Sequence, residues 1–268
     1  MNLFPTLTAV ALYATGATVI WRRMRAPRHP HGAGLAVLLV LAALAAHAVV
    51  LFPALWHDGA LDLGFVNAIS AVAWVVIGMY ALTALVQPIE SLGILLLPIG
   101  ALAVALNGFW PHAHQLLGVH STLYAAHIVI SLLAYALLSI AVAQSLMHAA
   151  QEKALRRHTP APWLRALPPL ETMERLMFGM IWIGFALLTA TLVSGVFFSE
   201  EIFGRPLRFT HHTVLSIIAW IVFAILLAGR VAMGWRGRVA MRLALGGFTA
   251  LALAYFGAKF VLELLLGR

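Results

Sequence analysis

Apolar residues run for about 20 positions at a time along this chain, and short polar or charged stretches separate the runs. A helical run of this length matches the hydrocarbon thickness of a bilayer. Inside lipid the backbone N–H and C=O groups have no water to bind, so each run must be a helix or belong to a closed barrel of alternating strands. The runs do not alternate, and they therefore predict transmembrane helices.

About eight such runs occur in residues 1–268, which we interpret as one transmembrane helical domain without a clear internal repeat. They cover residues 3–21, 33–55, 65–85, 91–110, 121–147, 177–198, 213–233 and 239–265. The turn from Gln87 to Glu90 is so short that the helices on either side must form an antiparallel hairpin. A longer proline-containing connection, about residues 151–174, is expected to lie at the headgroups. The predicted fold class is all-α, a polytopic membrane protein.

Composition agrees with this class and excludes others. Hydrophobic residues make up 63% of the 268 positions and charged residues only 10%, which is unlike a soluble domain of this length. The absence of cysteine excludes disulfides, thiolate metal sites and iron–sulfur clusters within the chain. The net charge of +8 is best explained by topology signals and anionic-lipid contacts beside the spans, so the expected partner is the lipid bilayer and not nucleic acid.

The distribution of basic residues predicts the orientation. Of the 17 lysines and arginines, 13 fall on one side of the predicted bundle: after the first span, between the fifth and sixth, and around the turn after the seventh. Cytoplasmic loops carry such an excess. Both termini are therefore expected on the other side, which in a bacterial inner membrane is the periplasm.

Histidines are the most informative polar residues. Of the twelve, eight fall in the predicted periplasmic half: His47, His57, His112, His114, His120, His127, His211 and His212. At about 1.5 Å per residue, His47 lies in the outer third of the second span, and His127 lies at a similar depth in the fifth. His211 and His212 stand at the outer mouth of the seventh. Imidazoles from separate helices at one level suit a bis-histidine haem site, in which an apolar helical wall holds the macrocycle.

Other interpretations compete with this one. His57, His112 and His114 are expected at a solvated surface. For His120, a solvated surface position and a functional role are about equally favoured. His47 and His127 are deep enough to act as ligands, or to pack while bonded to a neighbouring helix. Zinc prefers tight local spacings with a carboxylate, and no such set occurs within a span. The loop group His112, His114 and His120 is a weak alternative site for a divalent ion.

Several segments resemble a known family. They are 127–136, 183–195, 211–220 and 230–237, with 64–70 in the first half. Together they resemble the cytochrome c assembly membrane proteins of the CcsA/CcmC-like superfamily, and within it the eight-helix HemX or YpjD branch. The resemblance implies haem handling at the outer face, with His127 at the position of a haem-ligating histidine. The chain differs from haem-delivering members in the loop 197–209, which has no tryptophan, and at Ala228, where a histidine is expected. These differences favour holding haem by another pair over direct delivery to apocytochrome c.

The resulting hypothesis is a haem-binding inner membrane protein that is not an enzyme. His127 and His212 are the first-choice axial ligands of a b-type haem iron, and His211 and His47 are second choices or ligands of another haem. Expected partners are haem and proteins of cytochrome c assembly or haem synthesis. The alternative is a regulatory or scaffolding membrane protein of haem synthesis or cytochrome maturation that does not itself transfer haem. Ion transport is disfavoured because no acidic residue lies near mid-membrane, and small-solute transport is disfavoured because the sequence shows little of a polar path through the bundle.

Overall fold

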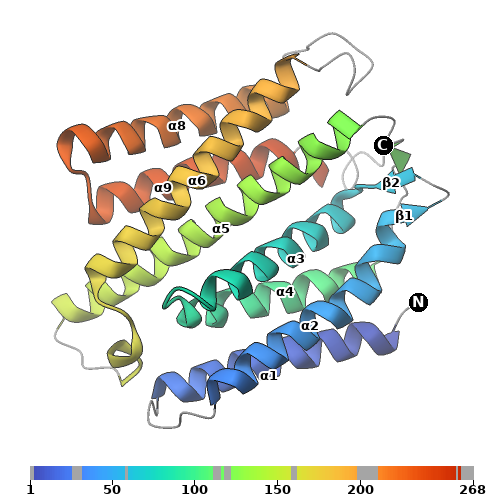
Figure 1. The fold of residues 1–268 in the computed structure, drawn as a ribbon, viewed down its shortest axis with the longest axis horizontal. Coiled ribbons are helices and arrows are strands. Elements are labelled where there is room, and N and C mark those ends of the chain that lie inside the picture. Colours follow the sequence, from blue (N-terminus) through green and yellow to red (C-terminus); the bar gives the residue numbers. More distant parts are fainter. Residues whose placement is uncertain are drawn as a thin grey trace.

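The structure, a computed structural model, consists of long helices that cross the molecule back and forth (Figure 1). It describes residues 3–25, 32–57, 60–110, 116–117, 122–157, 162–197, 211–257 and 259–260. The elements are α1 (Leu3–Arg25), α2 (Gly32–Leu55), β1 (Trp56–His57), β2 (Ala60–Asp62), α3 (Phe65–Ala84), η1 (Glu90–Leu92), α4 (Gly93–Phe109), β3 (Leu116–Leu117), α5 (Thr122–Arg156), η2 (Pro162–Ala166), α6 (Leu170–Phe197), α8 (His211–Met233), α9 (Gly237–Ala252) and η3 (Leu253–Gly257).

Eight helical segments within the described residues are long and apolar enough to cross a membrane. The predicted all-α fold class and the eight spans are therefore confirmed, although the last residues of the eighth predicted span, 261–265, lie outside the described residues. The short hairpin between α3 and α4 is also present, and the Glu90 carboxylate at this turn pairs with Arg23 at the end of α1. The Tyr80 hydroxyl donates a hydrogen bond to the Glu90 carbonyl at 2.9 Å, which closes the turn onto α3.

Two helices extend beyond the predicted spans. α5 continues to Arg156 and α6 begins at Leu170, so residues 151–156 and 170–174 of the expected connection at 151–174 belong to these helices, and that expectation was too wide. The hydrophobic run marks only the part of a helix that contacts lipid. Beyond it, backbone hydrogen bonding continues through polar residues that favour a helix.

A small antiparallel sheet with the strand order β1, β2, β3 covers one end of the bundle. Trp56 pairs with Leu61, and Leu61 pairs with Leu117. Hydropathy does not predict these strands, because two or three residues are too few to show the period of two that identifies a strand.

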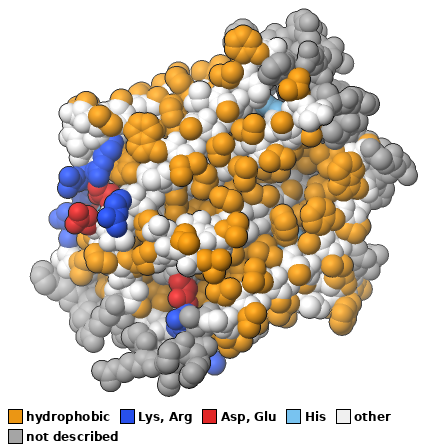
Figure 2. Space-filling view, in the orientation of Figure 1, with side chains coloured by type: hydrophobic (Ala, Val, Ile, Leu, Met, Phe, Trp, Pro, Cys, Tyr) orange, Lys and Arg blue, Asp and Glu red, His pale blue; other side chains and the backbone are white. Residues whose placement is uncertain are grey.

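We name the two ends of the bundle by their side chains. The arginine end contains the ends of α1 and α5 and the turn between α8 and α9, with Arg23, Arg156 and Arg230. The histidine end contains the sheet, the start of α5 and the start of α8, with His127 and His212. Figure 2 shows Lys, Arg, Asp and Glu side chains gathered toward the arginine end of the visible face, while the surface between the ends is mainly hydrophobic.

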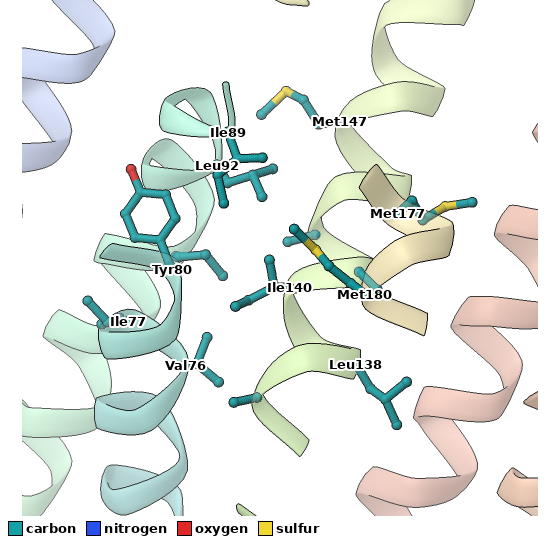
Figure 3. Packing of buried hydrophobic residues seen from close by; sticks show 14 of the residues in the cluster. Val76, Ile77, Tyr80, Ile89, Leu92, Leu138, Ile140, Met147, Met177 and Met180 are labelled. Carbon is teal, nitrogen blue, oxygen red and sulfur yellow. The ribbon is translucent and has the colours of Figure 1, made fainter. Parts of the chain in front are cut away.

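The core joins two groups of helices. In the first group α1 packs against α2 and α4; in the second α5 packs along α6, and α8 packs against α9. Buried aliphatic and methionine side chains of α5 and α6 face those of α3 and of the α3–α4 turn (Figure 3). Gly184 of α6 lets α6 approach α5 closely, because a Cβ at this position would lie 2.8 Å from a side-chain atom of Leu138 on α5.

The turn after α8 offers a test of this packing. A Cβ on Gly229 would come within 2.2–2.6 Å of three ring atoms of Trp235, so Gly229→Ala is expected to displace the indole. We expect it to lower the unfolding free energy by about 1–3 kcal/mol, as overpacking does, in denaturant unfolding in detergent. The control is Gly246→Ala on α9, where no atom lies within 4 Å. It should be neutral or stabilising by up to about 1 kcal/mol, and equal losses in both variants would contradict the packing argument.

Candidate histidine site at one end of the bundle

His127 lies just over one turn into α5 and is half-buried. Its Nδ1 is 2.8 Å from the hydroxyl of Ser194 on α6. That hydroxyl in turn donates to the carbonyl oxygen of Thr191 at 3.0 Å. Gly195 lies beside the ring, since a Cβ there would be 3.6 Å from His127 Cε1. The imidazole is therefore held against α6 at a defined orientation.

The hydrogen bonds of Ser194 assign the tautomer of His127. A serine has one hydroxyl proton, and the carbonyl oxygen of Thr191 can only accept, so Ser194 can make both contacts at once only by donating to Thr191. The Ser194 oxygen then accepts a hydrogen bond from His127 Nδ1–H. The neutral ring consequently carries its lone pair on Nε2. A hydrogen bond from one ring nitrogen that fixes the orientation and tautomer of the other is the usual arrangement of a metal-ligating histidine.

His212 approaches the same place from α8. It is the second residue of that helix and is exposed, and it is close enough to His127 for the charge on one imidazole to act on the other. Its ring lies edge to face with Tyr255 of η3, with 6.2 Å between the ring centroids. Three separate elements, α5, α8 and η3, therefore meet beside this pair of imidazoles.

Aromatic side chains form one side of the site. The Tyr255 ring contacts those of Tyr135 and Phe256 at centroid distances of 6.5 and 5.3 Å. The Tyr135 hydroxyl donates to the carbonyl oxygen of Leu251, so α5 is tied to the end of α9. The site thus combines two imidazoles with aromatic rings that meet one another edge to face.

The other two predicted ligands are placed differently. His211 is exposed, and the described residues provide it with no ring or hydrogen-bond contact. His47 is 0% exposed. Its Nδ1 is 3.0 Å from the Tyr13 hydroxyl and its Nε2 is 2.8 Å from the Ser70 hydroxyl. Both ring nitrogens of His47 thus bond to neighbouring helices and join α2 to α1 and α3. This is the packed arrangement that the sequence suggests as the alternative to ligation. Its role as a ligand stays a prediction, and ligation would require one of these bonds to break.

The remaining histidines of this half fall outside the part that the structure describes, or have undescribed side chains. This holds for His112, His114, His120 and the side chain of His57, so the predicted divalent-ion loop is not described. Among the described residues, no three His, Asp or Glu side chains gather to hold a metal ion. A haem iron differs from such a site because the porphyrin supplies four donors and the protein needs to add only two.

Sequence reasoning did not identify Ser194 and Tyr255 as site residues. Ser194 lies within the segment 183–195 that carries the family resemblance, but nothing in the sequence pairs a serine on one helix with a histidine 67 positions earlier. In the sequence, Tyr255 has the position of an ordinary aromatic residue at the membrane–water interface. Both contacts depend on how α6 and α9 pack against α5 and α8.

The fold and the site together define a class: polytopic α-helical membrane proteins that carry a pair of histidines at one end of the bundle. The family model described as cytochrome C assembly protein matches residues 35–266, and the chain belongs to this family. It is a multi-pass protein of the bacterial inner membrane.

One relative that matches over its full length, one that matches over most of its length and one partial relative illustrate the family relationship. Inner membrane protein YpjD of Escherichia coli K12 is 31% identical over 99% of this chain and 100% of its own length. A 28.8 kDa protein encoded in the nifR3-like 5' region of Azospirillum brasilense is 34% identical over 87% and 85%. Cytochrome c biogenesis protein CcsA of Gloeobacter violaceus is 31% identical, over only 35% of this chain and 28% of its own length. No solved structure matches.

Proposed function

We propose that this protein binds a b-type haem at the histidine end, with His127 Nε2 and His212 as axial ligands of the iron. The observation that carries this proposal is the hydrogen bond from His127 Nδ1–H to Ser194, because it orients the imidazole and leaves the lone pair on the other nitrogen. His212, the second residue of α8 and in contact with the Tyr255 ring, would provide the second imidazole. Bound haem would supply a six-coordinate, redox-active iron.

The residues of this chain have separate roles in the proposed site. Ser194 fixes the His127 ring, and Tyr255 supports the His212 ring. The aromatic rings of Tyr135 and Phe256 keep water from one side of the site. We assign binding and presentation of haem to these groups, and no catalysis.

The family supports a place in cytochrome c assembly, in which haem is held near the periplasmic face. The concentration of arginine at the opposite end favours this orientation by the positive-inside rule. We propose partners among proteins of cytochrome c assembly or haem synthesis. The rival function is regulation or scaffolding of such proteins by a chain whose histidines only pack.

The absorption spectrum of the purified protein tests the proposal. After expression with ample haem, the reduced protein is expected to show the bands of a six-coordinate b-type haem. His212→Ala should remove the six-coordinate spectrum, while the adjacent His211→Ala should retain it, since only His212 is packed beside Tyr255 and near His127. A colourless protein that still co-purifies with a partner would contradict haem binding and favour the regulatory function.

A further inference from the structure

A second polar site lies at the arginine end, on the opposite side of the bundle from the imidazole pair. It is a cavity of about 380 Å³ between the end of α5, the start of α6 and the start of α9. Its polar lining is His148, Glu152 and Arg156 from α5, Glu171 and Glu174 from α6, and Arg236 before α9. His127 and His148 are 21 residues apart on one helix, a rise of about 31 Å, which is close to the hydrocarbon thickness of a bilayer.

His148 lines this cavity, and its ring nitrogens are accessible and not sealed in the interior. Its side chain is 8% exposed, and the described residues provide no hydrogen-bond partner for either ring nitrogen. Gln144 and Gln151 flank it on the same face of α5, and each has a buried carbonyl oxygen without a partner in the described residues. Because the ring nitrogens of His148 are accessible and have no partner among the described residues, a polar group that enters the cavity can form a hydrogen bond with this imidazole.

Some of the charged side chains that line the cavity form ion pairs, and others have no ion-pair partner among the described residues. Glu152 pairs with Arg156 at 2.8 Å, and Glu174 pairs with Arg230 at 2.6 Å. Glu171 and Arg236, by contrast, are exposed and have no ion-pair partner among the described residues. The cavity therefore presents one open negative charge, one open positive charge and one buried imidazole. The charged side chains in this region are visible near the arginine end in Figure 2.

We propose that this cavity binds a small zwitterion, a molecule that carries a primary ammonium group and an anionic group a few bonds apart. The ammonium group would bind Glu171, and the anionic group would bind Arg236 and accept a hydrogen bond from His148. The headgroup of phosphatidylethanolamine has this chemistry, and so has soluble phosphoethanolamine. The position of the cavity, one hydrocarbon thickness from His127, lies at the level of lipid headgroups. This site is independent of the proposed haem site.

Binding to the delipidated, full-length protein in detergent tests the proposal. Native mass spectrometry can measure the affinity for short-chain phosphatidylethanolamine, phosphatidylcholine and phosphatidylglycerol, and the affinity for soluble phosphoethanolamine can be measured in parallel. We expect phosphatidylethanolamine to bind at least tenfold more tightly than the other two lipids. Phosphatidylcholine has no ammonium proton to donate, and phosphatidylglycerol has no cationic group. Equal binding of soluble phosphoethanolamine would assign the site to a free zwitterion, and its failure to bind would assign the site to the lipid.

Charge-neutral variants connect the binding to the cavity. Glu171→Gln and Arg236→Gln should each weaken phosphatidylethanolamine binding at least fivefold. Both residues are exposed and unpaired in the described structure, so the fold should tolerate the changes. The control is Arg238→Gln, an exposed arginine in the same turn that does not line the cavity, and it should bind as the wild type does. Equal affinity for the three lipids, or equal effects of Arg236→Gln and Arg238→Gln, would overturn the proposal. The haem spectrum should be unchanged in all three variants.

Discussion

His127→Ala is expected to abolish the six-coordinate haem spectrum of the purified protein. The substitution removes the imidazole that α6 holds through Ser194, and a small apolar side chain cannot coordinate iron. The loss of haem affinity should exceed the 10–100-fold that follows removal of an outer hydrogen-bond partner of a ligating histidine. Haem titration followed by optical spectroscopy measures this effect.

Two serines on either side of the histidine provide a matched pair for the same experiment. Ser194→Ala removes the acceptor of the Nδ1 proton and should weaken haem binding about 10–100-fold. Ser131→Ala removes a hydroxyl that bonds the backbone carbonyl of His127 at 2.6 Å and leaves the ring contact intact, so its affinity should stay near that of the wild type. A full haem spectrum in His127→Ala, or equal behaviour of the two serine variants, would show that His127 is not held as a ligand.

His47→Leu is expected to destabilise the fold without changing the haem spectrum. The variant leaves the hydroxyls of Tyr13 and Ser70 buried without the partner that each has in the native protein. An unsatisfied buried polar group costs about 1–3 kcal/mol, although hydrogen bonds between membrane helices average only about 0.6 kcal/mol. We expect a loss of about 1–3 kcal/mol in unfolding free energy, measured by denaturant titration in detergent.

A triple variant separates the unsatisfied hydroxyls from the lost side chain. Tyr13→Phe, His47→Leu and Ser70→Ala together remove all three polar groups, so the triple variant should recover much of the stability that His47→Leu loses. If instead His47→Leu kept its stability and lost haem absorbance, the sequence-based alternative that makes His47 a ligand would be correct.

Hydropathy was sufficient to predict the eight spans, because the requirement for internal backbone hydrogen bonds in lipid leaves few structures for a long apolar run. Hydropathy did not predict the segments outside the lipid, where backbone groups do not need to bond to one another. The polar ends of α5 and α6 are helical, and the strands around Leu61 form a sheet too short to leave a periodic signal. The span predicted at 213–233 agrees with α8, which begins two residues earlier, at His211.

The candidate site could be predicted only in part. Depth along the helices placed His47 and His127 at similar levels, but depth does not tell which face of a helix a side chain occupies. Packing gives His47 two hydroxyl partners on α1 and α3, and it turns His127 toward Ser194 on α6. These outcomes depend on the rotation of each helix about its own axis, which one sequence does not specify.

The two imidazoles of the proposed site differ in stiffness. His127 is held between α5 and α6 by its hydrogen bond to Ser194, whereas His212 lies in the first turn of α8, where backbone N–H groups lack intrahelical acceptors. Swinging the exposed ring outward therefore disturbs few neighbours, while turning the other ring breaks an interhelical bond. A haem bound by both imidazoles would therefore dissociate first from His212 of α8 and last from His127 of α5.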